Sequence, residues 1–421
     1  MLRVAYVLAF SDRIQVGLDS IWYRLVSGTI ASGDGYIDPE MFYGHGTSVA
    51  TAFRPPLYPF FLALVTKTIG SSPRTFQLAG CGVGVITIVL VGYLGRRVAG
   101  NAVGLCAAAL AAVYPIFLAV DAAVMSETLY VPLVAGCVLA VYRAMEQPTT
   151  LQWALVGALA GAAILTRGDA VLLIPVLVVP AALFGLHLPW RRRLVLAVGS
   201  LTVAGLVVAP WVIRNDQRLG TPTIATLQTG TAIAGTNCPD TYYGKLLGSW
   251  SFECTQRPDQ ASISEVALNN ELQRDGRRYV LDHSGRLLLV VPARILRQWG
   301  LYNPIDEARF EAVESRNVTW QLVSWTAYLP VALLAGYGLV LLRRRGARVL
   351  PLVAIIVTVT GTAALVYGQQ RLRVSAEPVL LVGAAVAIVH IARGSDTNDP
   401  AEIRRKAGCE PTRLSLRHPR D

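Results

Sequence analysis

Five charged residues lie beside apolar segments of this sequence, where a charged side chain is costly unless it has a partner or a function. They are Asp19, Arg54, Glu127, Arg371 and Arg373. The carboxylate of Asp19 is suited to take a proton from an incoming hydroxyl group. The guanidinium groups are suited to bind phosphate through paired hydrogen bonds. The set predicts base catalysis beside a bound anion.

The two acidic residues also have an ordinary structural explanation. Asp19 would cap a helix expected over residues 20–31, because a carboxylate accepts hydrogen bonds from the free N–H groups of a first turn. Glu127, with Ser126, would cap the start of a later helix. For Asp19 the two roles do not exclude each other.

The basic residues have a comparable alternative. An isolated arginine at a membrane interface usually extends to lipid phosphates, which would account for Arg54, and lipid headgroups would account for Arg371 and Arg373. Arg167 and Asp169 stand at a tight turn between two apolar runs. Pairing of these two with each other is at least as well supported as a role in ligand binding.

The composition indicates an integral membrane protein. The 421 residues are 53% hydrophobic and 15% charged, with a mean hydropathy of +0.47, which is not typical of a soluble domain. The net charge of +11 comes from clusters between apolar runs rather than from a basic face with interleaved aromatic residues. Nucleic-acid binding is therefore not expected.

Apolar runs near the ~20 residues that cross a bilayer recur along the chain, and each should be a helix because backbone polar groups cannot face lipid. The expected runs are 75–95, 101–120, 126–145, 150–166, 168–187, 194–213, 320–342, 349–366 and 377–393.

Basic clusters in the short connections set the expected orientation. Arg96 with Arg97, the 191–193 cluster and the 343–345 cluster would be cytoplasmic. The segments expected outside are 11–73, 121–125, 167–169, 214–319 and 367–376. Two segments do not fit a simple crossing: 57–70 contains Lys67 and suits an interfacial helix, and the first apolar segment is so short that the sequence appears to begin inside its first helix.

The predicted fold class is therefore an all-α polytopic membrane protein: a helix bundle with juxtamembrane helices in the first external loop and a small external loop region. The expected parts are a short first span with an external catalytic loop (1–73), transmembrane helices (74–213), an external region with amphipathic helices (214–319), C-terminal transmembrane helices (320–393) and a basic cytoplasmic tail (394–421).

Cys238 and Cys254 bracket a polar loop and would form a disulfide in an oxidising compartment, with two free thiols as the alternative. The five histidines are scattered, and none is spaced with a cysteine pair as in a metal site. No metal and no cofactor are expected.

A series of motifs, taken in order, is more specific than any one residue. After Asp19 come "YRLVSGTIASGDGY", "FRPPLYPFFLAL", "MSETLYVPL", "AILTRGDAVLLIP", "APWVIRNDQRLG" and "QRLRVSAEPVLLVGAA". This series resembles the polytopic GT-C glycosyltransferases, and within them the branch of protein O-mannosyltransferases and lipid A aminoarabinose transferases. The resemblance extends from the N-terminus to about residue 393.

The resemblance implies an enzyme that takes a sugar from a polyprenyl-phosphate donor on the outer face of the membrane. Asp19 matches the family's catalytic aspartate, and Arg54 the basic residue that holds the lipid phosphate. Glu127 matches a glutamate near the site, and Arg371 with Arg373 a basic pair that helps bind the phosphate. The acceptor hydroxyl would attack the anomeric carbon with inversion.

Two positions depart from the family pattern: Ser20 stands where the protein mannosyltransferases have a glutamate, and the first span is short. The expected partners are a polyprenyl-phosphate sugar, a hydroxyl acceptor (protein, glycan or lipid) and the membrane, and the expected location is the plasma (inner) membrane. The alternatives are a lipid or solute transporter or flippase and an inactive scaffold. We see no internal repeat of the kind common in transporters, and the polar residues gather at one face, which favours the enzyme.

Overall fold

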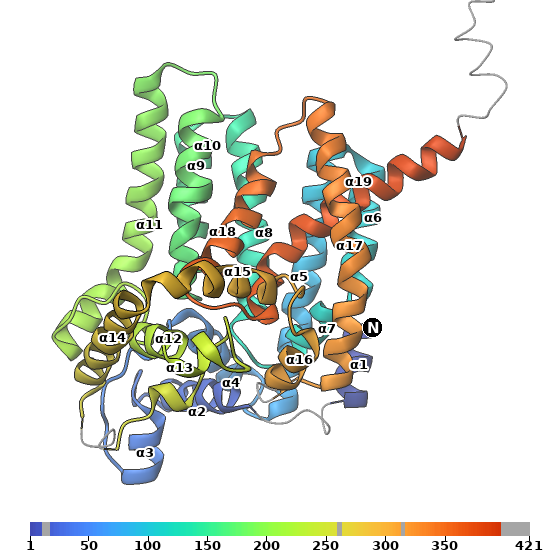
Figure 1. Cartoon of the computed structure of the whole chain (residues 1–421). Coiled ribbons are helices and arrows are strands. Elements are labelled where there is room, and N and C mark those ends of the chain that lie inside the picture. The colour runs from blue at the N-terminus through green and yellow to red at the C-terminus, as the bar shows by residue number, and fades with distance from the viewer. Residues whose placement is uncertain (11–16, 259–262, 313–315, 397–421) are drawn as a thin grey trace, which may run out of the picture.

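The computed structural model describes residues 1–10, 17–258, 263–312 and 316–396. Within these ranges the chain is helical, and its only β pairing is an isolated bridge between Ile37 and Ala50. Long helices stand side by side in the upper part of the molecule, and shorter helices gather at the lower end (Figure 1). The predicted all-α class is confirmed.

Five helical segments in the described residues are long and apolar enough to cross a membrane. They are α5 (Pro73–Ala99), α8 (Glu127–Glu146), α11 (Trp190–Leu219), α17 (Val318–Arg344) and the continuous segment Gln370–Gly394, which joins the 3₁₀-helix η7 (Gln370–Ala376) to α19 (Glu377–Asp396). Helices α6 (Asn101–Val113) and α7 (Pro115–Ala122) would make a sixth span, bent by 55°. The bend occurs at Pro115, which lacks the N–H needed to continue α6.

The remaining apolar helices are shorter than a regular span: α4 (Leu57–Thr68), α9 (Thr150–Ile164), α18 (Leu350–Leu365) and the run Gly168–Phe184. The expectation of one regular span over 168–187 is wrong. The structure has there a 3₁₀-helix, η2 (Gly168–Leu172), a π-helix, η3 (Ile174–Val178), and α10 (Val179–Phe184). Pro175 and Pro180 each lack a backbone N–H, so two hydrogen bonds of a regular α-helix are missing within this run.

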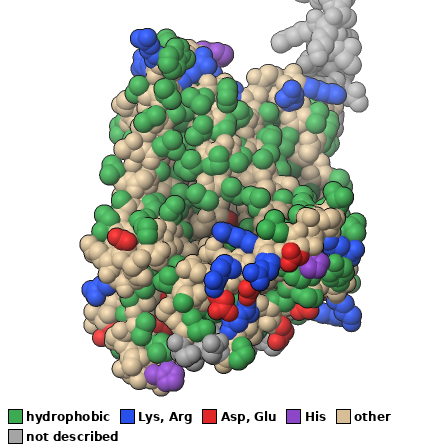
Figure 2. All heavy atoms as spheres, turned by 60° about the vertical axis from the view of Figure 1, so that its left-hand side comes forward, with side chains coloured by type: hydrophobic (Ala, Val, Ile, Leu, Met, Phe, Trp, Pro, Cys, Tyr) green, Lys and Arg blue, Asp and Glu red, His purple; other side chains and the backbone are tan. Residues whose placement is uncertain are grey.

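The surface has the pattern expected of a protein in a bilayer. In Figure 2 hydrophobic side chains cover most of the upper part of the face in view, Lys and Arg lie at its top, and charged side chains of both signs gather in the lower part. Large apolar side chains of the long helices, such as Val85, Leu206 and Leu333, are exposed. Lipid would cover them.

The two ends of α8 lie at opposite ends of the bundle. Near its last turn Arg97 pairs with Glu146, and Arg348 donates to the carbonyl of Met145 at 3.0 Å. The basic clusters that follow α5 and α17 therefore share one end. Glu127 begins α8, about 30 Å away for a helix of this length.

Helices α17 and α19 pack so closely that a side chain at their contact is excluded. A Cβ atom at Gly338 would lie 1.9 Å from the carbonyl oxygen of Gly383. Gly336, two residues earlier on the same helix, has no atom within 4 Å of its would-be Cβ. Small residues at such contacts let membrane helices approach each other closely.

We expect Gly338→Ala to destabilise the protein by about 1–3 kcal/mol, because the added methyl group must push two packed helices apart. Gly336→Ala is the matched control, since it adds the same methyl group into open space. Melting temperatures of the purified variants in detergent measure the difference. Equal melting temperatures would show that the contact between α17 and α19 is not close.

The lower end of the molecule is built from short helices outside the spans. They are α1 (Leu2–Phe10), α2 (Leu18–Ser32), α3 (Pro39–His45), α12 (Thr229–Thr236), α13 (Pro239–Tyr243), η4 (Glu253–Thr255), α14 (Glu265–Asp282), η6 (Ser284–Arg286), α15 (Leu287–Gln298) and α16 (Pro304–Ala312). Helices α2 and α4 pack together through a cluster that includes Tyr23, Tyr58 and Leu62.

Candidate active site

Asp19 lies between two arginines that come from distant parts of the chain. It stands in the first turn of α2 and is 8% exposed. Arg54 donates to one carboxylate oxygen, Oδ1, and Arg371 Nη2 lies 3.3 Å from the other, Oδ2. Both oxygen atoms of this acid are therefore engaged by guanidinium groups.

Asp19 does not cap its helix. The N-cap residue of α2 is Gly17, and among the described residues no side-chain cap hydrogen bond is made at this position. The capping explanation is therefore wrong, because the helix begins two residues earlier than expected and the carboxylate turns toward the arginines instead.

Arg54 is held against aromatic rings rather than extended to lipid. Arg54 is followed directly by Pro55 and Pro56, which restrict the backbone at and after this residue. The Cζ atom lies 5.3 Å from the ring centroids of Tyr23 and Phe53, a distance typical of cation–π contacts. Because Arg54 is 7% exposed, the alternative of an arginine that reaches to lipid headgroups does not hold.

Glu127, the first residue of α8, is 1% exposed and extends the network. Its Oε1 atom accepts a hydrogen bond from Arg167 Nη1 at 3.0 Å and lies 3.5 Å from Arg371 Nε. Its other oxygen, Oε2, is buried without a hydrogen-bond partner among the described residues. A buried acceptor in that condition is costly, which makes it a natural place for a donor from a substrate.

Arg167 completes a chain of alternating charges. It bridges Glu127 and Asp169, with its Nε atom 3.0 Å from Asp169 Oδ1. Burial alone would lower the pKa of Arg167, but the two carboxylates raise it above its usual value, so the guanidinium stays charged. The expected pairing of Arg167 with Asp169 is present, whereas the contact with Glu127 was missed from the sequence. The only sequence signal for it was a charged pair at a turn between apolar runs.

The network has three positive and three negative members, in the order Arg54, Asp19, Arg371, Glu127, Arg167 and Asp169. Each internal member contacts a partner on both sides. Charges this deeply buried are tolerated only when they are paired in this way.

Arg373 does not join this network. Its Nε atom pairs with Glu377 Oε1 at 2.7 Å, and its Cζ atom lies 3.5 Å from the ring centroid of Tyr328. Tyr114 also donates to Glu377, at 2.8 Å. The resemblance implies that Arg371 and Arg373 bind phosphate as a pair, but the segment that carries them, η7, is a 3₁₀-helix. With three residues per turn, residues two apart point in different directions.

Helix α16 positions Arg371 through its backbone. The N–H of Arg371 donates to Glu311 Oε1 at 2.5 Å, and Glu311 pairs with Arg316 at 3.0 Å. Both Glu311 and Arg316 are 2% exposed or less. Glu311 of α16 therefore holds η7 at the site.

The segment before Arg54 is fixed from the side by α14. Glu265 Oε1 accepts a hydrogen bond from the N–H of Ala52 at 3.2 Å. Burial raises the pKa of Glu265 to about 7 from its usual 4.5. The acid is therefore protonated in the folded protein at pH values where it ionises in the unfolded chain.

We expect Glu265 to lower the stability of the protein as the pH rises from about 4.5 to 7, by a contribution of about 3 kcal/mol at most. Below pH 4.5 the carboxyl group of Glu265 is protonated in both the folded and the unfolded protein, so its titration does not lower the stability. Between the two pKa values the unfolded chain loses its proton first, and above about 7 the cost is constant. Melting temperatures between pH 5 and 8.5 measure the effect. Glu265→Gln should make the fall less steep, with the remainder coming from Glu307, whose pKa burial also raises to about 7. Glu271→Gln, a control at a more exposed glutamate, should leave the profile as in the parent protein.

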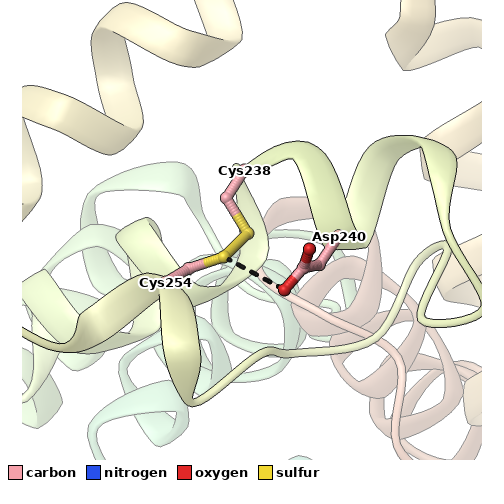
Figure 3. Close-up of side chains that lie close together, drawn as sticks. All are labelled: Cys238, Asp240 and Cys254. Carbon is pink, nitrogen blue, oxygen red and sulfur yellow. Dashed lines mark hydrogen bonds between the residues drawn. A yellow bond between two sulfur atoms is a disulfide. The ribbon is translucent and has the colours of Figure 1, made fainter.

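Cys238 and Cys254 are joined by a disulfide, with their Cα atoms 6.3 Å apart. The carboxylate of Asp240 lies beside it, 3.7 Å from the sulfur of Cys254 (Figure 3). In the described residues these three form a group close enough to hold a metal ion. Once the sulfurs are oxidised to a disulfide neither is a thiolate, so this group is not suited to a metal.

Residues 53–213 match the family model described as dolichyl-phosphate-mannose-protein mannosyltransferase, a range that includes Arg54, Glu127 and Arg167. No curated protein matches the chain.

Solved structures match along nearly the whole chain. The archaeal oligosaccharyltransferase AglB from Archaeoglobus fulgidus, in complex with an inhibitory peptide and a dolichol-phosphate, has a TM-score of 0.54 at 15% identity, covering 96% of this chain and 49% of that one. The apo form has the same TM-score and the same identity, and the match covers 95% of this chain and 49% of that one. ArnT from Cupriavidus metallidurans bound to undecaprenyl phosphate has a TM-score of 0.46 at 17% identity. The match covers 97% of this chain and 79% of that one.

This chain therefore spans about half the length of the oligosaccharyltransferase whose fold it shares. The expected resemblance to GT-C glycosyltransferases is confirmed, by the family model for residues 53–213 and by the fold for nearly the whole chain.

Proposed function

We propose that this protein is a multi-pass membrane glycosyltransferase that moves a sugar from a polyprenyl-phosphate donor to a hydroxyl acceptor, with inversion. The observation that carries the proposal is the buried Asp19 carboxylate held between Arg54 and Arg371 at one end of the helix bundle. The basic clusters lie at the other end, and by the positive-inside rule the site would face the outside of the plasma (inner) membrane. The solved relative that holds a dolichol-phosphate supports a lipid-phosphate donor.

The proposed reaction needs one base and a set of cations. The acceptor oxygen attacks the anomeric carbon from the side opposite the phosphate, so a new carbon–oxygen bond forms as the bond to the phosphate oxygen breaks. The bonding electrons leave with the polyprenyl phosphate, and the acceptor proton passes to Asp19. Arg54 and Arg371 stabilise the negative charge that develops on the departing phosphate.

The charge network imposes an order on this reaction. A carboxylate whose two oxygens are held by guanidinium groups is a poor proton acceptor. A donor phosphate offers oxygens that bind the same guanidinium groups in parallel pairs. Arg54 and Arg371 would therefore move from Asp19 to the phosphate when the donor binds, and only then is Asp19 free to act as a base.

Glu127 and Arg167 have supporting roles in this scheme. Glu127 keeps Arg371 in place through Oε1, while its unpaired Oε2 is an acceptor for a hydroxyl of the transferred sugar. Arg167, fixed by Asp169, balances the charge of Glu127 when Arg371 turns to the phosphate.

The test is to incubate membranes that contain the protein with radiolabelled polyprenyl-phosphate hexoses and pentoses, and to ask which label moves and to what. We expect one donor to be consumed, its label to appear in a protein, glycan or lipid fraction, and Asp19→Asn to stop this. A donor that crosses reconstituted vesicles without being consumed, at a rate unchanged by Asp19→Asn, would instead establish a flippase.

A further inference from the structure

A cavity of about 310 Å³ lies between α2, α3, α4 and α5, apart from the charge network. Its polar wall contains Arg24, Tyr43 and Ser71, and its apolar wall contains Ile21, Leu25 and Phe76. None of the described residues that line it is acidic. The lining is therefore mostly apolar and carries one positive charge.

The cavity is separate from the Asp19 site although α2 contributes to both. Arg24 follows Asp19 by five residues, which at 100° per residue turns its side chain about 140° around the helix. Tyr23 stands between them and packs edge-on against Tyr58, with ring centroids 5.0 Å apart. A ligand in this cavity would thus contact the face of α2 opposite to Asp19.

Arg24 differs from the arginines of the network in its lack of a counter-ion. Its Nε atom is buried and has no hydrogen-bond partner, and no carboxylate pairs with Arg24 among the residues that the structure describes. A partly buried guanidinium without an acceptor loses hydration and gains nothing in return. An anion in the cavity would restore the lost interactions.

The surroundings of the cavity are apolar. Ile21, which lines it, is 38% exposed, and Tyr43 is 55% exposed, so the cavity opens to the surface. Leu18 on α2 and Leu64 on α4 are 65% and 61% exposed. Exposed apolar side chains on short helices beside a bundle of spans are typical of the membrane interface.

We propose that this cavity binds the phosphate-bearing headgroup of a lipid, with Arg24 on the phosphate and Ile21, Leu25 and Phe76 against the first part of its chains. A free phosphate would satisfy Arg24 but leave the apolar wall in water, which is why a lipid fits better. Because α2 carries both Arg24 and Asp19, a lipid in this cavity would also hold the helix that presents the catalytic acid.

The experiment titrates the full-length chain in detergent with dioctanoyl phosphatidic acid and counts bound lipids by native mass spectrometry. Dioctanoylglycerol supplies the same chains without phosphate, and inorganic phosphate supplies the anion without chains. The Asp19 site also suits a lipid phosphate, so the expected effect of Arg24→Gln is the loss of one bound phosphatidic acid per chain, or a weakening of that binding step by about tenfold or more.

Lys67→Gln on the neighbouring helix α4 removes the same charge outside the cavity and should bind as the parent protein does. Ser71→Trp narrows the cavity without a change of charge and should lose the same lipid, which covers the case that Arg24→Gln fails to fold. The proposal is overturned if Arg24→Gln keeps full binding while folded. It is also overturned if dioctanoylglycerol or inorganic phosphate binds at the Arg24-dependent step as tightly as phosphatidic acid.

Discussion

Asp19→Asn is expected to reduce sugar transfer by about 1000-fold or more while the protein still binds polyprenyl phosphate. The amide has nearly the shape of the carboxylate but cannot accept the acceptor's proton, and loss of a positioned base typically costs 10²–10⁴-fold. Transfer of label from the donor and binding of polyprenyl phosphate to the purified protein measure the two effects.

The same variant should bind polyprenyl phosphate more tightly than the parent protein, by up to about tenfold. Arg54 and Arg371 must leave Asp19 before they bind the donor phosphate, and in the variant they no longer have a charged competitor within the protein. Asp34→Asn, at an exposed aspartate beyond the end of α2, is the control and should match the parent in both measurements. Weaker binding by Asp19→Asn would count against the exchange of partners, and undiminished transfer would count against Asp19 as the base.

Arg371→Gln and Arg373→Gln are expected to fail in different ways, although the two residues are separated by only one position. Loss of Arg371 removes a direct contact to Asp19 and Glu127, so we expect kcat/KM for transfer and the affinity for polyprenyl phosphate to fall by about 100-fold. Its melting temperature serves as the check that the variant is folded.

Arg373→Gln should instead reduce stability. It leaves the fully buried carboxylate of Glu377 without its cation, which typically costs about 3–5 kcal/mol. The protein that remains folded should bind polyprenyl phosphate with the parent affinity. The double variant Arg373→Gln with Glu377→Gln should recover part of the lost stability, because no unpaired charge remains. Equal loss of phosphate binding in both single variants would show that the two arginines act as the pair expected from the sequence.

The helical spans followed from composition and length. Polar backbone cannot face lipid, so a run of apolar residues must be helical whatever its neighbours are. The run over 168–187 is helical as well, but its division into 3₁₀-, π- and α-helical parts is not visible in any hydropathy pattern. The bend at Pro115 between α6 and α7 is a local effect of one residue on an otherwise apolar segment.

The candidate residues were predicted from the energetic cost of placing a charge near an apolar segment. Their contacts could not be predicted. Asp19, Arg54, Glu127 and Arg371 are charges near apolar segments, and the structure brings these four together. Arg373 met the same criterion and lies elsewhere, paired with Glu377. The criterion selects buried charges, and a charge that stabilises the fold satisfies it as well as one that binds a substrate.

By itself the sequence determined the all-α membrane fold, the helical segments and a short set of costly charges, because each of these depends on local composition and on the solvent around it. Only the tertiary structure decided which charges face one another. Asp19 and Arg371 are 352 positions apart in the chain, and their contact depends on the 3₁₀ geometry of η7, on the anchoring of its backbone by Glu311 and on the packing of α2 against α4. Ion pairs form through space, and the local sequence around each charge contains no information about the direction of its partner.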